Sequence, residues 1–284
     1  MDSSLVTLFL IIGLLSGTAM GILTWRLPAE ILRPSSTGEA GSTSEFTFSG
    51  SRCCQCQTPL FWYDTVPLLG WMLLKGKCRH CGQPVSTRYP LLEGLCAMMA
   101  VICYALHPAS MIMSLALFLF FWFVLALSVI DLQHYLLPDK LTLPLLWVGL
   151  LFNAFFGPVS SQDAIVGAAA GYLILWLLYW LVRLICHKEG IGYGDFKMLA
   201  AVGAWCGWRE VPVILYVASI AGIFYGLLLW VKKGHFGDPI PFGPALALSG
   251  WGCFCWAVWP SAAWRTSPWR RRCLKPPPPS GPWG

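Results

Sequence analysis

The chain has 284 residues, of which 57% are hydrophobic and only 11% are charged, and its formal net charge is +6. A soluble globular domain carries about 25% charged residues, so this composition excludes an ordinary soluble domain. We therefore expect an all-α polytopic protein embedded in the lipid bilayer, with no nucleic-acid partner.

The first predicted element is an apolar run over residues 5–25. About 20 apolar residues cross the hydrocarbon core of a bilayer, so this run is long enough to span it. Only Asp2 is charged ahead of the run, which argues against a cleaved secretory signal because such signals begin with positive charge. Seven further runs predict about eight transmembrane helices in total; they are residues 91–106, 111–130, 141–156, 164–185, 198–208, 211–231 and 240–259. The pattern GAAAG at residues 167–171 is typical of close helix packing in lipid.

A polar segment between the first two runs contains two cysteine pairs, Cys53-x2-Cys56 and Cys78-x2-Cys81. Two such pairs joined by a loop are typical of a tetrahedral site in which four thiolates hold Zn²⁺. A zinc ion would also explain how a small polar segment folds without a large apolar core. Two disulfides are the alternative pairing, and His80 is an alternative ligand. Four filled positions leave no vacancy for a catalytic water, so the predicted role of the metal is structural.

Lys and Arg residues predict the orientation of the chain, because connections on the cytoplasmic side are rich in them. With eight spans, the cysteine segment shares one side with three later connections, and together these hold nearly all the basic residues of the connections. That side is predicted to be cytoplasmic. The resulting division is a first helix (1–25), a zinc-binding segment (26–90), a helical bundle (91–260) and a disordered basic, Pro-rich tail (261–284).

Three aspartates follow or precede apolar runs at the predicted cytoplasmic edge: Asp131, Asp139 and Asp195. Asp139 stands where a helix N-cap is expected, and Asp195 has the same alternative reading. Asp131 ends its run, where the helix dipole disfavours an anion, so capping does not account for it. Two carboxylates brought together share one proton, which is the chemistry of an aspartic protease. We therefore predict Asp131 and Asp195 as the catalytic pair.

The residues around Asp195 are predicted to support it. Gly192 and Gly194 permit unusual backbone shapes and the close approach of a peptide substrate. Lys197 either holds the charge of Asp195 or extends to the membrane surface. GIGYG superficially resembles a nucleotide-binding loop, but a predicted membrane helix precedes it and no strand does. The sequence carries no fingerprint for a methyl donor.

Several motifs together resemble the type IV prepilin peptidases, also called leader peptidase/N-methyltransferases. They are WRLP (25–28), the four cysteines, WYDTVPLLGWMLLKGKCRHCGQPVSTRYPLLE (62–93), IDLQHYLLPDKLTLPLLW (130–147), GIGYGDFKMLAAVGAWCGW (190–208) and IPFGPALALSGW (240–251). The resemblance implies a bacterial inner-membrane aspartic endopeptidase of the GxGD type, with Asp131 and Asp195 catalytic and the cysteines binding zinc. Its substrates would be prepilins of type IV pili or pseudopilins of type II secretion, cleaved at the cytoplasmic face.

The resemblance further implies that the new N-terminal residue, usually Phe, is methylated with S-adenosylmethionine as the donor. Residues 16–28 lack the asparagine and phenylalanine that the family usually has there. A peptidase without methylation is therefore one alternative. A membrane transporter or assembly factor with a zinc module is another, and it would place polar residues near mid-span.

Overall fold

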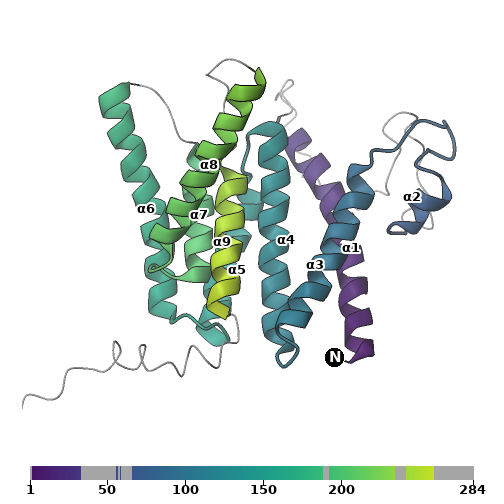
Figure 1. The fold of residues 1–284 in the computed structure, drawn as a ribbon, viewed down its shortest axis with the longest axis horizontal. Coiled ribbons are helices and arrows are strands. Elements are labelled where there is room, and N and C mark those ends of the chain that lie inside the picture. Colours follow the sequence, from purple (N-terminus) through teal and green to yellow (C-terminus); the bar gives the residue numbers. More distant parts are fainter. Residues whose placement is uncertain are drawn as a thin grey trace, which may run out of the picture.

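The structure, a computed structural model, describes residues 2–32, 56, 58, 66–187, 192–233 and 241–258. Within them nine helices are present and no strand, apart from an isolated bridge between Lys77 and Pro84. Figure 1 shows the longer helices side by side in one bundle, with the short α2 beside it. The prediction of an all-α protein is confirmed. The helices are α1 (Ser3–Ile31), α2 (Leu69–Leu73), α3 (Arg88–Leu106), α4 (Met111–His134), α5 (Asp139–Phe155), α6 (Ser161–Cys186), α7 (Tyr193–Cys206), α8 (Val211–Lys233) and α9 (Gly243–Val258).

Five of these helices, α1, α3, α4, α6 and α8, are long and apolar enough to cross a membrane. Each of the eight predicted apolar runs coincides with one helix, but three of the helices are shorter. The lengths of α5, α7 and α9 are 17, 14 and 16 residues. A membrane-spanning helix needs about 20 residues, so the five long helices are the candidate spans of the described chain.

Two helix boundaries differ from those predicted by five residues or more. Helix α1 continues to Ile31, beyond the predicted end at residue 25, and the added turn buries Leu27 and Pro28. Helix α7 begins at Tyr193 instead of residue 198, because Asp195 and Phe196 are packed inside the bundle. Asp195 therefore belongs to the first turn of a helix. The predicted tail, residues 261–284, lies outside the described residues.

Glycines allow the closest helix contacts of the bundle. A Cβ atom on Gly13 or Gly17 of α1 would lie 2.5 Å from a backbone Cα of α3. Helices α6 and α7 meet in the same way, where Gly167 faces the backbone of Gly203 and Gly171 faces that of Leu199. Small residues let helices in lipid approach until their backbones touch. The packing role predicted for GAAAG is confirmed.

Helix α7 forms the core on which the other helices pack. Its Trp205 is fully buried, with ring centroids 4.9 Å from Phe120 of α4 and 5.3 Å from Phe254 of α9. The Trp205 Nε1–H donates to the carbonyl oxygen of Leu145 in α5 at 2.9 Å. The amide of Asn153 in α5 donates to the Ala204 and Trp205 carbonyl oxygens at 2.8 and 3.0 Å, which satisfies the last turn of α7. The buried helix that carries Asp195 is thus fixed at its far end.

Adding one methyl group at Gly203 should destabilise the protein, because its Cβ would overlap the backbone of Gly167. We expect Gly203→Ala to cost about 1–3 kcal/mol, as other overpacked cores do. Gly252→Ala is the matched control, since no atom lies within 4 Å of its added Cβ. Thermal unfolding in detergent should show a lowered midpoint for Gly203→Ala alone. Equal midpoints for the two variants would contradict the packing described here.

Candidate active site

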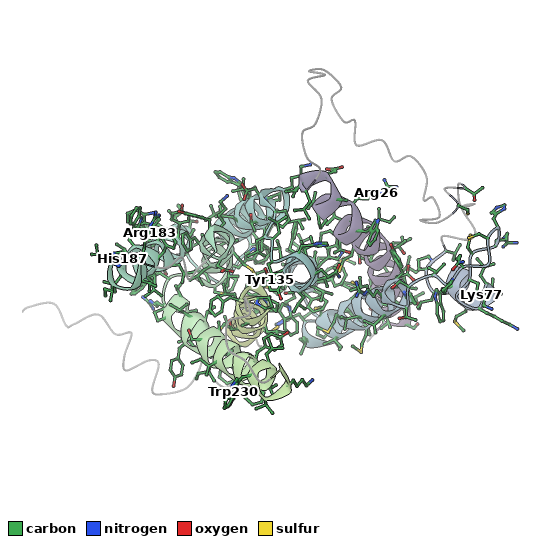
Figure 2. All side chains as sticks on the ribbon, turned by 90° about the horizontal axis from the view of Figure 1, so that it is seen from above. Arg26, Lys77, Tyr135, Arg183, His187 and Trp230 are labelled. Atoms are coloured by element: carbon green, nitrogen blue, oxygen red, sulfur yellow. The ribbon has the colours of Figure 1, made fainter. Side chains whose placement is uncertain are left out.

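Asp131 and Asp195 are buried at the ends of two neighbouring helices. Asp131 lies in the last turn of α4 and is 5% exposed, and Asp195 lies in the first turn of α7 and is 8% exposed. Tyr135, which follows α4, lies near the middle of the bundle when it is viewed from above, whereas Arg183 and His187 lie at its edge (Figure 2). The carboxylates thus occupy the interior at one end of the bundle, as predicted for a pair.

The two carboxyl groups are close enough to influence each other electrostatically. Asp195 belongs to α7, which is not one of the five candidate membrane spans. Burial, and after it the negative charge of Asp131, raises the pKa of Asp195 to about 7, while a hydrogen bond from the Gly192 backbone acts in the opposite direction. A carboxyl group with this pKa keeps its proton for part of the time at neutral pH.

Asp131 is held by the N-terminus of α9. The backbone N–H of Gly243, the first residue of α9, donates to Oδ2 of Asp131 at 2.9 Å. A Cβ on Gly243 would lie 2.6 Å from that same oxygen, so a larger residue would displace the carboxylate. The positive end of the α9 dipole therefore faces Asp131. Sequence reasoning assigned Gly243 no role, although a Gly-Pro step before an apolar run is a recognisable helix start.

The glycines beside Asp195 serve close packing. Gly192 has φ of −74° and is the N-cap of α7, so its backbone is not in the left-handed region that favours glycine. A Cβ on Gly194 would lie 2.7 Å from Cβ of Leu137, which belongs to the connection between α4 and α5. The predicted need for an unusual backbone is therefore wrong at Gly192, whereas Gly194 lets α7 approach the end of α4.

Lys197 and Asp139 pair with each other. The ammonium nitrogen of Lys197 lies 2.6 and 2.8 Å from the two carboxylate oxygens of Asp139, which joins the first turns of α7 and α5. Neither alternative predicted for Lys197 describes this contact. Asp139 is the first residue of α5, and the N-cap is Pro138, so the predicted capping role is wrong. A carboxylate in the first turn still matches the helix dipole.

Three of the four predicted metal ligands come together. The Sγ atoms of Cys56, Cys78 and Cys81 all lie within 4.8 Å of one another, and His80 is not part of this cluster. The Cys78 N–H donates to Gln83 O at 2.8 Å, and the Gly82 N–H to Cys78 O at 3.0 Å, which makes a tight turn around the second pair. Cys53 lies outside the described residues. Three convergent thiols can hold a metal ion of the kind that prefers sulfur.

A buried glutamate connects this segment to the bundle. Glu93 of α3 is 7% exposed, and its two oxygens accept from the Leu68 backbone N–H at 2.7 Å and from the Thr18 hydroxyl at 2.9 Å. Leu68 has φ of 57°, a strained value for a residue with a branched side chain. Sequence reasoning did not single out Glu93, because its partners lie 25 and 75 residues away.

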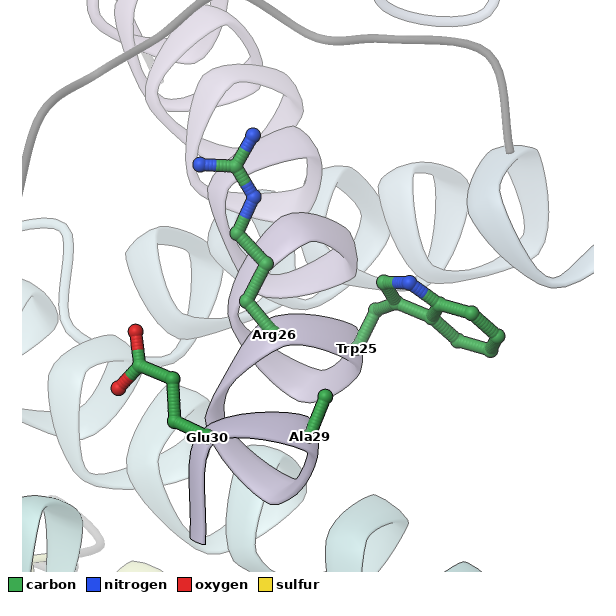
Figure 3. A pocket seen from close by; sticks show the side chains of 4 residues that line it. All are labelled: Trp25, Arg26, Ala29 and Glu30. Atoms are coloured by element: carbon green, nitrogen blue, oxygen red, sulfur yellow. The ribbon is translucent and has the colours of Figure 1, made fainter. Parts of the chain in front are cut away.

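A shallow pocket on α1 lies apart from these groups. Figure 3 shows its lining, Trp25, Arg26, Ala29 and Glu30, along one side of the helix end. Glu30 forms an ion pair with Lys140 of α5 at 2.9 Å. Neither Asp131 nor Asp195 lines this pocket.

Comparisons with known proteins agree with this arrangement. A model described as the type IV leader peptidase family matches residues 118–227, and one for the bacterial peptidase A24 N-terminal domain matches residues 11–107. No solved structure matches the chain.

Three relatives carry the name prepilin leader peptidase/N-methyltransferase. The protein from Aeromonas hydrophila is 44% identical over 89% of this chain and 90% of its own length. That from Stutzerimonas stutzeri is 41% identical over 87% and 89% of the two chains. The Escherichia coli K12 protein is 50% identical over 66% and 72%.

Proposed function

Because this chain belongs to the type IV leader peptidase family, we propose that it removes the leader peptide from prepilins or pseudopilins and methylates the new N-terminal amine. The observation that carries the proposal is the burial of Asp131 and Asp195 at the same end of the bundle. A transporter would place its polar groups near mid-span, whereas these acids lie in terminal turns of their helices.

The chemistry follows from the unequal protonation of the pair. The ionised carboxylate takes a proton from water as the water oxygen attacks the scissile carbonyl carbon. The protonated partner donates to the carbonyl oxygen and stabilises the tetrahedral intermediate. The intermediate then breaks its C–N bond. The proton held by the first carboxyl passes to the leaving amine, and the proton on the former carbonyl oxygen returns to the partner carboxylate. The Gly243 N–H keeps Asp131 oriented through these steps.

Methylation uses the amine that cleavage releases. The relatives' name includes N-methyltransferase, and S-adenosylmethionine is the donor proposed for this chain. When bound, it would supply the methyl group for this modification.

We propose that the pair and the cysteine cluster face the cytoplasm, in an inner-membrane protein with about eight spans. The distribution of charge supports this orientation. The connections and helix ends on the side of Asp131 and Asp195 are rich in Lys and Arg, whereas the connections between helices on the opposite side contain a single such residue, Arg209. The basic residues of the proposed cytoplasmic connections and helix ends include Arg26, Lys75, Lys77, Arg79, Arg88, Lys140, Arg183, Lys197, Lys232 and Lys233. The division at residues 25, 90 and 260 stays a prediction.

Replacing either aspartate should abolish leader cleavage, because an amide neither accepts the proton from water nor returns it. We expect Asp131→Asn and Asp195→Asn each to lower kcat by about a thousandfold or more, as loss of an essential acid or base does. The measurement is incubation of the purified protein with a prepilin and mass spectrometry of the product, which reports leader loss and methyl addition together. Asp139→Asn is the matched control and should keep most of the activity. An active Asp131→Asn with an inactive Asp139→Asn would reverse the assignment.

Cleavage should also depend on pH around neutrality. The pKa of Asp195 is raised to about 7, so the carboxyl holds its proton below that pH and loses it above. We expect kcat to fall as the pH rises from about 6 to about 8, because the pair then has no proton left to donate. A kcat that stays level across this range would contradict the shared proton.

The cysteine cluster is proposed to hold one structural zinc ion, with Cys53 as the fourth ligand to Cys56, Cys78 and Cys81. We expect about one zinc per chain in the purified full-length protein, and a loss of most of it in Cys78→Ser or Cys81→Ser. Elemental mass spectrometry provides the measurement. Cys253→Ser, a thiol of α9 far along the chain from the cluster, is the control and should keep its zinc. A chain that binds no metal would retire the site.

A further inference from the structure

A buried hydroxyl group links α6 to the first residue of α7. The guanidinium of Arg183 donates to Oη of Tyr179 at 3.1 Å, and the Tyr193 hydroxyl donates to the same oxygen at 3.1 Å. A guanidinium can only donate, so the Tyr179 oxygen is the acceptor that both groups share. Tyr179 is 2% exposed, and a tyrosine hydroxyl at such a depth needs partners of this kind.

Aromatic contacts extend this link along α7. The ring of Tyr179 lies 5.2 Å from that of Tyr193 and 5.8 Å from that of Phe196, and the latter two lie 5.6 Å apart. All three pairs are tilted or edge-to-face, which are favourable ring geometries. The guanidinium of Arg183 also lies 5.4 Å from the centre of the Trp180 ring, and this cation–π contact helps to hold Arg183 in place beside Tyr179. Asp195 is thus flanked in sequence by two rings that are both packed on Tyr179.

The start of α7 depends on such an anchor. Its N-cap is Gly192, which makes no side-chain capping bond, and Tyr193 stands between two glycines. Glycines widen the conformations open to the backbone, and an uncapped first turn frays more easily. On the side of α5 the turn is held by the exposed pair of Lys197 and Asp139, and exposed ion pairs contribute little. The contact with Tyr179 is less exposed, because Tyr179 itself is buried.

The direction of Asp195 follows from where Tyr193 is held. Side chains two residues apart on an α-helix point roughly 200° away from each other. Tyr193 held against α6 therefore directs Asp195 to the opposite side of α7, away from α6. The connection that follows α4 lies against this turn, where a Cβ on Gly194 would be 2.7 Å from Cβ of Leu137, and the charge of Asp131 acts on Asp195.

We propose that Tyr179 is a positioning residue for cleavage: its hydroxyl anchors Tyr193 and thereby fixes the orientation of Asp195 toward Asp131. The inference rests on the proposed catalytic role of Asp195. Tyr179 touches no reacting atom and acts through the first turn of α7. A shift of about 1 Å in a catalytic group lowers the rate strongly, so loss of the anchor should affect kcat more than substrate binding.

The test removes one hydroxyl at a time and keeps the rings. We expect Tyr179→Phe and Tyr193→Phe each to lower kcat for leader cleavage about three- to tenfold, with KM changed less than about twofold. The kcat of the double variant should be no lower than that of the more impaired single variant, because both hydroxyls take part in one contact. Tyr216→Phe on α8 is the matched control, since its side chain is 68% exposed, and it should behave as the unaltered protein. Tyr193 is itself 58% exposed, so Tyr193→Phe is expected to fold and carries the test even if Tyr179→Phe lowers the unfolding midpoint.

The outcomes separate this inference from the proposed function. An active Asp195→Asn would overturn both. An inactive Asp195→Asn together with Tyr variants that match Tyr216→Phe would overturn the inference alone. A change confined to KM, or losses of kcat that multiply in the double variant, would also overturn it, because the hydroxyls would then act separately or on the substrate.

Discussion

The structure is organised around the cost of burying two carboxyl groups together. Asp131 and Asp195 are each less than one-tenth exposed, inside a bundle whose outer surface is apolar. Two such groups cannot both ionise cheaply, so they need backbone donors and at least one proton between them. The N–H of Gly243 supplies a donor to Asp131, and that of Gly192 acts on Asp195. The ends of α4, α7 and α9 must therefore meet.

Helix α7 is the element that makes this burial compatible with a membrane. It has 14 residues, most of them buried, so the surrounding helices shield its charged first turn from lipid. Large apolar side chains of α6 and α8, such as Leu177 and Ile223, are exposed on the outside. Trp205 and Asn153 fix the far end of α7, and contacts with α5 and α6 hold its near end. The reactive turn is thus held from both ends.

Local pattern was enough to predict the parts of this arrangement that depend on neighbouring residues. Apolar runs located each helix of the bundle, the spacing of cysteines located the thiol cluster, and the placement of Asp131 at a helix end marked it as unusual. Two contacts between distant segments were not predicted. Gly243 reaches Asp131 across 112 residues, and Lys197 reaches Asp139 across 58. Capping preference predicted Asp139 as the N-cap of α5, whereas Asp139 is the first residue of that helix and binds a lysine from another helix.

The central claim is that the two buried carboxyl groups share a proton near neutral pH. Infrared spectroscopy measures this directly, because a protonated carboxyl group has a C=O stretch that the ionised form lacks. The account predicts a carboxyl band that titrates with a midpoint of about 7 and is lost in Asp195→Asn. If that variant left the carboxyl bands unchanged, or if every band titrated near pH 4, the ordinary range of an aspartate, the shared proton would be contradicted.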